Sequence, residues 1–131
     1  MKTEWTVSGT VVHGRRLGHA LGFPTANIEV SDDRLLSDGV YRARVVVDGV
    51  SYDAMSNLGR NPSVGGCRRR LETHLFGFDG DLYGRTLQVE LLERIRDERT
   101  FPSVDALRQQ LEEDKATILR RIEAIGVNKI E

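Results

Sequence analysis

The chain has little of several features that would at once assign a protein to a class. Among its 131 residues there is one cysteine, Cys67, so no internal disulfide can form, which excludes a disulfide-stapled secreted domain. No apolar run approaches the roughly 20 residues that a membrane-spanning helix needs, and the N-terminus lacks the apolar region of a secretory signal. We therefore expect a cytoplasmic protein that does not contact membranes.

Aromatic residues and excess charge are scarce as well. Aromatics make up 6% of the chain, and 19 Lys and Arg nearly balance 20 Asp and Glu, for a formal net charge of -1. Domains that bind nucleic acid usually combine a basic surface with aromatic stacking platforms, so we expect no nucleic acid partner. The length suits one domain, residues 1–131, with a core of its own, and we expect a monomer.

Most of the chain predicts strands. Segments in which apolar and polar residues alternate, each bounded by turn-forming residues, predict strands at about 5–12, 39–48, 50–55, 69–78 and 86–95. Asp48-Gly49 is a strong two-residue hairpin signal between the second and third of these. Glycines and an Asn-Pro pair predict loops at residues 14–22 and 57–66.

The strand at about 69–78 carries the polar residues whose roles matter most. Its alternation predicts two faces: Leu71, Thr73 and Leu75 on one, and Glu72, His74 and Phe76 on the other. The arginine run 68–70 is predicted to be a solvated sheet edge rather than a phosphate-binding cluster, since alternate residues of a strand point oppositely. His74 is assigned a structural or supporting role, because the three histidines lack metal-ligand spacing.

The C-terminal residues predict one helix at about 103–125. Ser103 is the predicted N-cap, Asp105 lies in the first turn, where the helix dipole favours negative charge, and Gly126 is predicted to end the helix. Apolar residues recur at helical spacing: Val104, Leu107, Leu111, Ile118, Ile122 and Ile125. Antiparallel strands over about 5–95 followed by one helix predict a mainly β fold, a small closed or nearly closed barrel that the helix seals.

A glycine-rich segment, residues 18–27, combines groups suited to phosphate chemistry. The Thr25 hydroxyl and the Asn27 amide are hard oxygen donors of the kind that Mg²⁺ prefers, and Pro24 favours an extended chain that presents both on one side. The glycines do not form a P-loop, because no Gly-Lys-(Ser/Thr) follows. On residue type alone, Thr25 could equally be an ordinary strand residue, Asn27 a turn former and Glu72 a solvated strand glutamate.

Taken together, five motifs resemble the riboflavin kinase family over essentially the whole chain. They occur in family order: Gly18-His19-Ala20-Leu21-Gly22-Phe23-Pro24-Thr25-Ala26-Asn27, Gly39-Val40-Tyr41, Asn57-Leu58-Gly59 with Pro62, Glu72-Thr73-His74 running into Asp81-Leu82-Tyr83-Gly84, and Arg96, Glu98 and Phe101 before the helix. Several independent motifs in the correct order argue against chance similarity. The chain departs from the family pattern at His19, at Ser63-Val64 and at Gly77.

The resemblance implies a six-stranded antiparallel Greek-key β-barrel with one C-terminal α-helix. It also implies that Thr25 and Asn27 hold Mg²⁺ with ATP, and that Glu72 is the catalytic base. The other residues that it implies in binding riboflavin or ATP are Gly14, Gly18, Gly22, Pro24, Asn57, Tyr83, Arg96 and Phe101. Tyr83 and Phe101 are candidates to bound the flavin ring, with core packing left open for each.

The activity that the resemblance implies is that of a riboflavin kinase, which makes FMN and ADP from riboflavin and ATP. No segment corresponds to the adenylyltransferase module of bacterial bifunctional members, so FAD formation is not expected. One alternative is a non-catalytic flavin- or nucleotide-binding module with the same barrel. The joint presence of Thr25, Asn27 and Glu72 argues against it, because a pure binder needs no base. A second alternative, a barrel that binds partners or single-stranded nucleic acid, is disfavoured by the charge balance.

Overall fold

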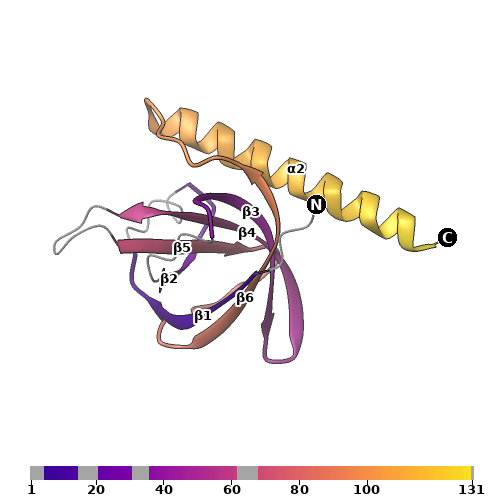
Figure 1. Ribbon diagram of the computed structural model, residues 1–131, viewed down its shortest axis with the longest axis horizontal. Helices are drawn as coiled ribbons and strands as arrows, with labels where there is room; N and C mark the ends of the chain where they lie inside the picture. The colour runs from indigo at the N-terminus through magenta and orange to yellow at the C-terminus, as the bar shows by residue number, and fades with distance from the viewer. Residues whose placement is uncertain (1–4, 15–20, 31–35, 62–67, 131) are drawn as a thin grey trace. The chain divides into compact units, whose positions relative to one another are not determined.

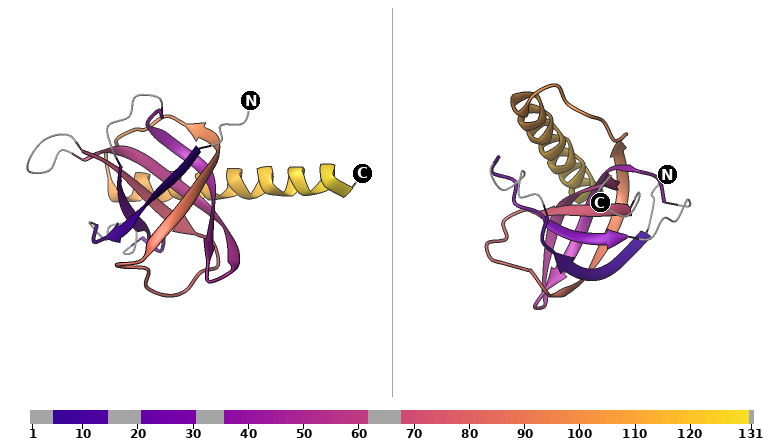
Figure 2. Two further views of the ribbon diagram at one scale, coloured as in Figure 1. Left: turned by 60° about the horizontal axis from the view of Figure 1, so that its bottom comes forward. Right: turned by 90° about the vertical axis from the view of Figure 1, so that its left-hand side faces the viewer.

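The protein folds into a closed six-stranded β-barrel and one long helix. The computed structural model describes residues 5–14, 21–30, 36–61 and 68–130. In chain order the elements are β1 (Trp5–Val12), β2 (Ala26–Val30), β3 (Gly39–Val47), β4 (Val50–Asn61), β5 (Arg68–Leu75), β6 (Thr86–Arg96) and α2 (Val104–Ile130). All neighbouring strands are antiparallel and close in the order β1-β2-β5-β4-β3-β6 (Figures 1 and 2). The expected mainly β fold, a closed antiparallel barrel with one C-terminal helix, is confirmed.

The barrel and the helix form two compact units, Met1–Arg99 and Thr100–Glu131, and each is described here by itself. The N-cap prediction for the helix is confirmed, because the Ser103 Oγ accepts the backbone N–H of Ala106 at 3.1 Å. Among the described residues, no helix has both the length and the apolar character that crossing a membrane requires.

The prediction that Gly126 ends the helix is wrong, because α2 continues to Ile130. Gly126 does not adopt the left-handed conformation that a helix-ending glycine takes. A glycine within a helix costs only about 1 kcal/mol relative to alanine and still donates its backbone hydrogen bond. The residues after it can therefore extend the helix.

One strand was not predicted from the sequence pattern, and another ends later than predicted. β2 is a strand that the alternation did not predict, since it is only five residues long. β4 continues to Asn61, although a loop was predicted from Asn57. Asn57 and Gly59 are poor strand formers in isolation, but Asn57 pairs with both β3 and β5, and Gly59 pairs with β5. The pairing with neighbouring strands outweighs the weak local strand propensity.

The hairpin prediction is confirmed at the β3–β4 turn. Asp48 and Gly49 both have positive φ, 51° and 81°, as a type I′ turn requires. Arg85 forms an ion pair with Asp48 at 2.7 Å, and its hydrogen bond lowers the pKa of that exposed carboxyl.

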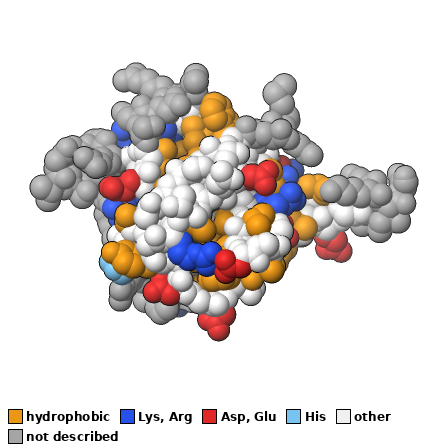
Figure 3. Space-filling model, turned by 90° about the horizontal axis from the view of Figure 1, so that it is seen from below, with side chains coloured by type: hydrophobic (Ala, Val, Ile, Leu, Met, Phe, Trp, Pro, Cys, Tyr) orange, Lys and Arg blue, Asp and Glu red, His pale blue; other side chains and the backbone are white. Residues whose placement is uncertain are grey.

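On the face shown in Figure 3, side chains of both charge signs lie near one another, with apolar atoms between them.

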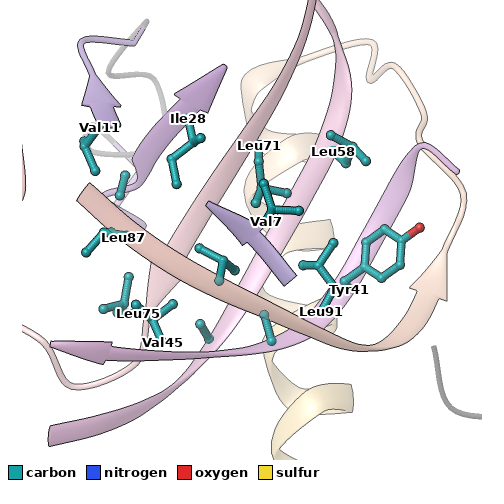
Figure 4. Close-up of a cluster of buried hydrophobic side chains, with 14 of the residues drawn as sticks. Val7, Val11, Ile28, Tyr41, Val45, Leu58, Leu71, Leu75, Leu87 and Leu91 are labelled. Atoms are coloured by element: carbon teal, nitrogen blue, oxygen red, sulfur yellow. The ribbon is translucent and has the colours of Figure 1, made fainter. Parts of the chain in front are cut away.

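The barrel interior is filled by apolar side chains from all six strands. Figure 4 shows ten of them converging: Val7, Val11, Ile28, Tyr41, Val45, Leu58, Leu71, Leu75, Leu87 and Leu91. Each fully buried side chain of this kind contributes roughly 1.5–3 kcal/mol through the hydrophobic effect. The interior also holds a satisfied polar pair, Ser56 and Thr73, whose hydroxyl oxygens are 2.7 Å apart. The predicted faces of β5 are confirmed, with Leu71, Thr73 and Leu75 buried and Glu72 exposed.

The prediction that residues 68–70 form a solvated edge is wrong for Arg69. β5 is paired on both sides in the closed barrel and has no free edge. Arg69 shares the inward face with Leu71 and is only 3% exposed. Its guanidinium donates to the Asp38 carboxylate at 2.7 and 2.9 Å and to the Leu36 carbonyl, which anchors the segment before β3 to the barrel.

Replacing Arg69 with alanine should therefore lower the free energy of unfolding by about 2–4 kcal/mol, because Asp38 and the buried Leu36 carbonyl lose their donor. Urea denaturation followed by circular dichroism measures this. Arg70→Ala is the matched control: Arg70 is partly exposed and approaches Glu29 only at 4.0 Å, so its loss should cost less than about 1 kcal/mol. Equal effects of the two variants would contradict the anchoring role of Arg69.

Candidate active site

Three predicted site residues lie side by side on the outer face of the barrel. Strand register puts Asn27 of β2 directly opposite Glu72 of β5, and Glu72 directly opposite Asn57 of β4. Residues opposite each other in antiparallel strands point to the same face, with Cβ atoms about 4.5–5.5 Å apart. The inward burial of their neighbours Ile28, Leu71 and Leu58 sets this face as the outer one. We refer to Asn27, Glu72 and Asn57 as the polar row.

Asn27 is buried although it faces outward. It is 5% exposed, and its amide nitrogen donates to the Thr25 carbonyl at 3.5 Å. Its Oδ1 is buried with no hydrogen-bond partner. An unpaired buried amide oxygen costs about 1–3 kcal/mol, and a bound cation would remove that cost. The donor that Mg²⁺ prefers is thus present, buried and unpaired.

Gly14 makes the position of Asn27 possible. A Cβ built on Gly14 would lie 2.5 Å from both Cγ and Oδ1 of Asn27, far inside van der Waals contact. Gly14 is not in the left-handed conformation, so its contribution is space rather than backbone freedom. Any side chain at this position would displace the Asn27 amide.

A cavity of about 350 Å³ lies beside Asn27. Four residues predicted to bind substrate or metal line it: Gly14, Pro24, Thr25 and Asn27. The other lining residues come from the end of β1, the start of β2, the inward face of β5 and the segment before β6: Val11, Val12, His13, Ala26, Thr73, Leu75, Phe78, Asp79, Gly80, Asp81 and Leu82. Thr25 and Asn27 thus line one space, and their predicted role in binding a ligand there stays a prediction.

His74 holds the turn that enters β2. Its Nδ1 is 2.8 Å from the Pro24 carbonyl oxygen, and its ring packs edge-on against Phe23 and Phe76, with centroids 5.3 and 5.6 Å away. This contact connects β5, which carries Glu72, to the segment that carries Thr25. The supporting role expected of His74 agrees with this position.

The segment before β6 is fastened over the same end of the barrel. Asp81 accepts the backbone N–H of Tyr83 at 2.9 Å, and the Gly84 N–H donates to the Val11 carbonyl at 2.9 Å. Tyr83 is 53% exposed, which excludes core packing, and stacks on the His13 ring with centroids 3.7 Å apart. His13 lines the cavity, so the stacked pair lies at the cavity's border. The sequence contained no signal for this pairing.

The remaining predicted site residues lie apart from the cavity or outside what is described. Arg96, at the end of β6, is opposite Val40, which is in turn opposite Asn57, so Arg96 continues the polar row two strands further on. Gly22 is exposed with φ +86° and does not line the cavity. Gly18 lies outside the described residues, as do the departures at His19 and Ser63-Val64. Phe101 belongs to the helical unit, so its relation to the cavity stays a prediction.

Two residues, Glu98 and Gly77, were given no role in the site from the sequence. Glu98 places its carboxylate over Gly59 of β4, where any side chain at position 59 would lie. Gly77, a departure from the family pattern, has φ +77°, a backbone conformation that glycine adopts at least cost. Only the folded chain brings Glu98 and Gly59 together.

Fold and site together describe a small barrel in which hard oxygen donors and a cavity adjoin an exposed carboxylate. Oxygen donors beside a cavity, with a carboxylate one strand away, are the kinds of group used by enzymes that transfer a phosphoryl group to an alcohol. The protein-family model described as Flavokinase, riboflavin kinase, matches residues 1–122. The chain therefore belongs to the riboflavin kinase family.

Individual relatives agree with this assignment. The bifunctional riboflavin kinase/FMN adenylyltransferase of Haemophilus influenzae is 39% identical over 114 residues, which cover 86% of this chain and 37% of that protein. The RNA-binding riboflavin kinase RibR of Bacillus subtilis is 38% identical over 122 residues, which cover 92% of this chain and 53% of that protein. The chain thus spans between about a third and about half of the length of these relatives.

A solved structure shares the fold. The riboflavin kinase of Trypanosoma brucei superposes with a TM-score of 0.63 at 24% identity, covering 90% of this chain and 79% of that one. At this identity the likeness concerns the fold alone.

Proposed function

We propose that this protein is an ATP-dependent riboflavin kinase, which transfers the γ-phosphoryl group of ATP to the terminal hydroxyl of the ribityl chain to give FMN and ADP. The observation that carries the proposal is the polar row: the Glu72 carboxylate lies between Asn27, next to the cavity, and Asn57 on the far side. Family membership supports the same activity.

We assign metal and phosphate binding to the β2 end of this row. Asn27, through its unpaired Oδ1, and Thr25 would hold Mg²⁺ together with the phosphates of ATP. When bound, the metal would neutralise the negative charge that develops on the transferred phosphoryl group. Asp79 and Asp81 also line the cavity, and because carboxylates repel phosphate oxygens, we expect the phosphates to contact Asn27 and Thr25 rather than these two residues.

Glu72 is the proposed general base. A primary alcohol is a poor nucleophile at neutral pH, and a carboxylate within hydrogen-bond reach can accept its proton as the new P–O bond forms. Glu72 is exposed, so an acceptor can reach it, and it adjoins the proposed metal ligand by one cross-strand step. The acceptor would approach Glu72 from the β4 side, where Asn57 lies, because the phosphates of ATP would occupy the β2 side, next to Asn27 and Thr25.

No further partner is proposed. The name of RibR includes RNA binding, but this chain has balanced charge and 6% aromatics, which do not favour nucleic acid. The expectations of a monomer and of a cytoplasmic location stay predictions.

Incubating the purified chain with riboflavin, ATP and Mg²⁺, and separating the flavins by chromatography, tests the proposal. We expect FMN and ADP in equal amounts, with none formed when ATP is omitted. A chain that binds FMN or riboflavin tightly and never forms FMN would instead be the non-catalytic flavin-binding module.

A further inference from the structure

The Glu98 side chain packs over Gly59, next to the polar row. A Cβ built on Gly59 would lie 3.0 Å from the Cδ of Glu98 and still closer to its Oε2, so the carboxylate occupies the space that a side chain at position 59 would take. Gly59 is not in the left-handed conformation, so the absence of a side chain, rather than backbone freedom, is what this position supplies.

Glu98 lies near Glu72 on the side away from the cavity. Gly59 is two residues beyond Asn57 on β4 and shares its outward face, a spacing of about 7 Å along the strand. Burial of its carboxyl group raises the pKa of Glu98, the Arg96 guanidinium opposes this, and the charges of Asp38 and Glu72 add to it. The influence of Glu72 on Glu98 agrees with their placement on one face. Glu98 as a whole residue is exposed, so a ligand can reach it.

The charge of Glu98 selects what can bind beside it. A carboxylate would repel the phosphates of ATP, but it accepts hydrogen bonds from hydroxyl groups, and such charge-assisted bonds are about twice as strong as neutral ones. On β4, the strand next to Glu72 on the side away from the cavity, Asn57 lies opposite Glu72 and the Glu98 carboxylate lies over Gly59, two residues along the same strand. This sequence of acceptors suits a neutral chain bearing several hydroxyls.

We propose that Glu98, seated over Gly59, binds the secondary hydroxyls of the acceptor's polyol chain and so aligns its terminal hydroxyl with Glu72. The proposal rests on the proposed function, because it takes the polar row as the place where the acceptor binds. It assigns Glu98 to recognition of the side chain of the flavin rather than of its ring.

The test compares two flavins that differ in that chain. Riboflavin carries the polyol, and lumiflavin has a methyl group in its place. Binding of each to the full chain is followed by quenching of flavin fluorescence, for the unmodified protein and for Glu98→Gln. We expect the riboflavin Kd to rise on the order of 10-fold and the lumiflavin Kd to stay within about twofold. In steady-state assays the KM for riboflavin should rise while the KM for ATP does not change.

A second variant separates the carboxylate's chemistry from its position. Gly59→Ala leaves the Glu98 side chain intact, but the added methyl group would occupy the space that the Glu98 carboxylate fills. This variant should therefore reproduce the selective loss of riboflavin affinity. Glu90→Gln, an exposed carboxylate on β6, is the matched control and should change neither Kd. Melting temperatures identify any variant that is simply unfolded.

The outcomes distinguish the two proposals. Equal weakening of riboflavin and lumiflavin, or an unchanged riboflavin Kd in Glu98→Gln, would overturn the role of Glu98 whether or not the chain makes FMN. Selective loss in a chain that binds riboflavin without phosphorylating it would uphold Glu98 and refute the kinase activity. A chain that binds no riboflavin at all would overturn both.

Discussion

Glu72→Gln is expected to lower turnover on the order of 10²- to 10⁴-fold while leaving riboflavin and ATP binding nearly unchanged. Glutamine keeps the size and the hydrogen-bonding reach of glutamate but cannot accept a proton. Because Glu72 is exposed on the outer face, the change should not disturb the core. Single-turnover formation of FMN, measured beside flavin binding by fluorescence, separates the chemical step from binding.

Glu90→Gln is a suitable control for this experiment too, since it makes the same change on the outer face of another strand. It should retain full activity. Near-normal FMN formation by a folded Glu72→Gln protein would show that Glu72 only positions the acceptor, and the base would have to be sought elsewhere.

The second large effect is expected at Asn27 and Gly14. Asn27→Ala removes the buried oxygen proposed to hold the metal, and Gly14→Ala leaves that oxygen in the chain but forces the amide away. Both variants should weaken binding of ATP with Mg²⁺ on the order of 10- to 100-fold. A chelator should abolish turnover in the unmodified chain. Isothermal titration with ATP, with and without Mg²⁺, measures the effect without relying on activity.

Asn27→Asp is the comparison that isolates the oxygen donor, because it keeps an oxygen at the same reach and should retain more metal-dependent ATP binding than Asn27→Ala. The riboflavin Kd should change little in all three variants, since the acceptor lies on the other side of Glu72. If Gly14→Ala bound ATP normally in a folded protein, the close approach of Gly14 to Asn27 would have no functional meaning.

Much of the barrel could be predicted from local sequence patterns. The faces of β5, the Asp48-Gly49 turn and the Ser103 cap were all recognised, because each depends on neighbours within a few residues. The family resemblance supplied the sixth strand, which alternation alone missed. For the site, the motif residues Thr25 and Asn27 were predicted to serve one space, and both line the cavity.

The sequence by itself determined which residues could carry the chemistry: an oxygen donor pair after Pro24, one glutamate in a β-strand, and glycines that permit close packing. Only the tertiary structure decided how they meet. Barrel closure pairs β5 with both β2 and β4, which brings Asn27, Glu72 and Asn57 together from distant parts of the chain. The same closure leaves β5 no edge, so Arg69 turns inward to Asp38, and it lets Glu98 fill the space over Gly59. Such contacts escape local patterns because they depend on strand register and on which side chains are absent, and both are set only when the sheet closes on itself.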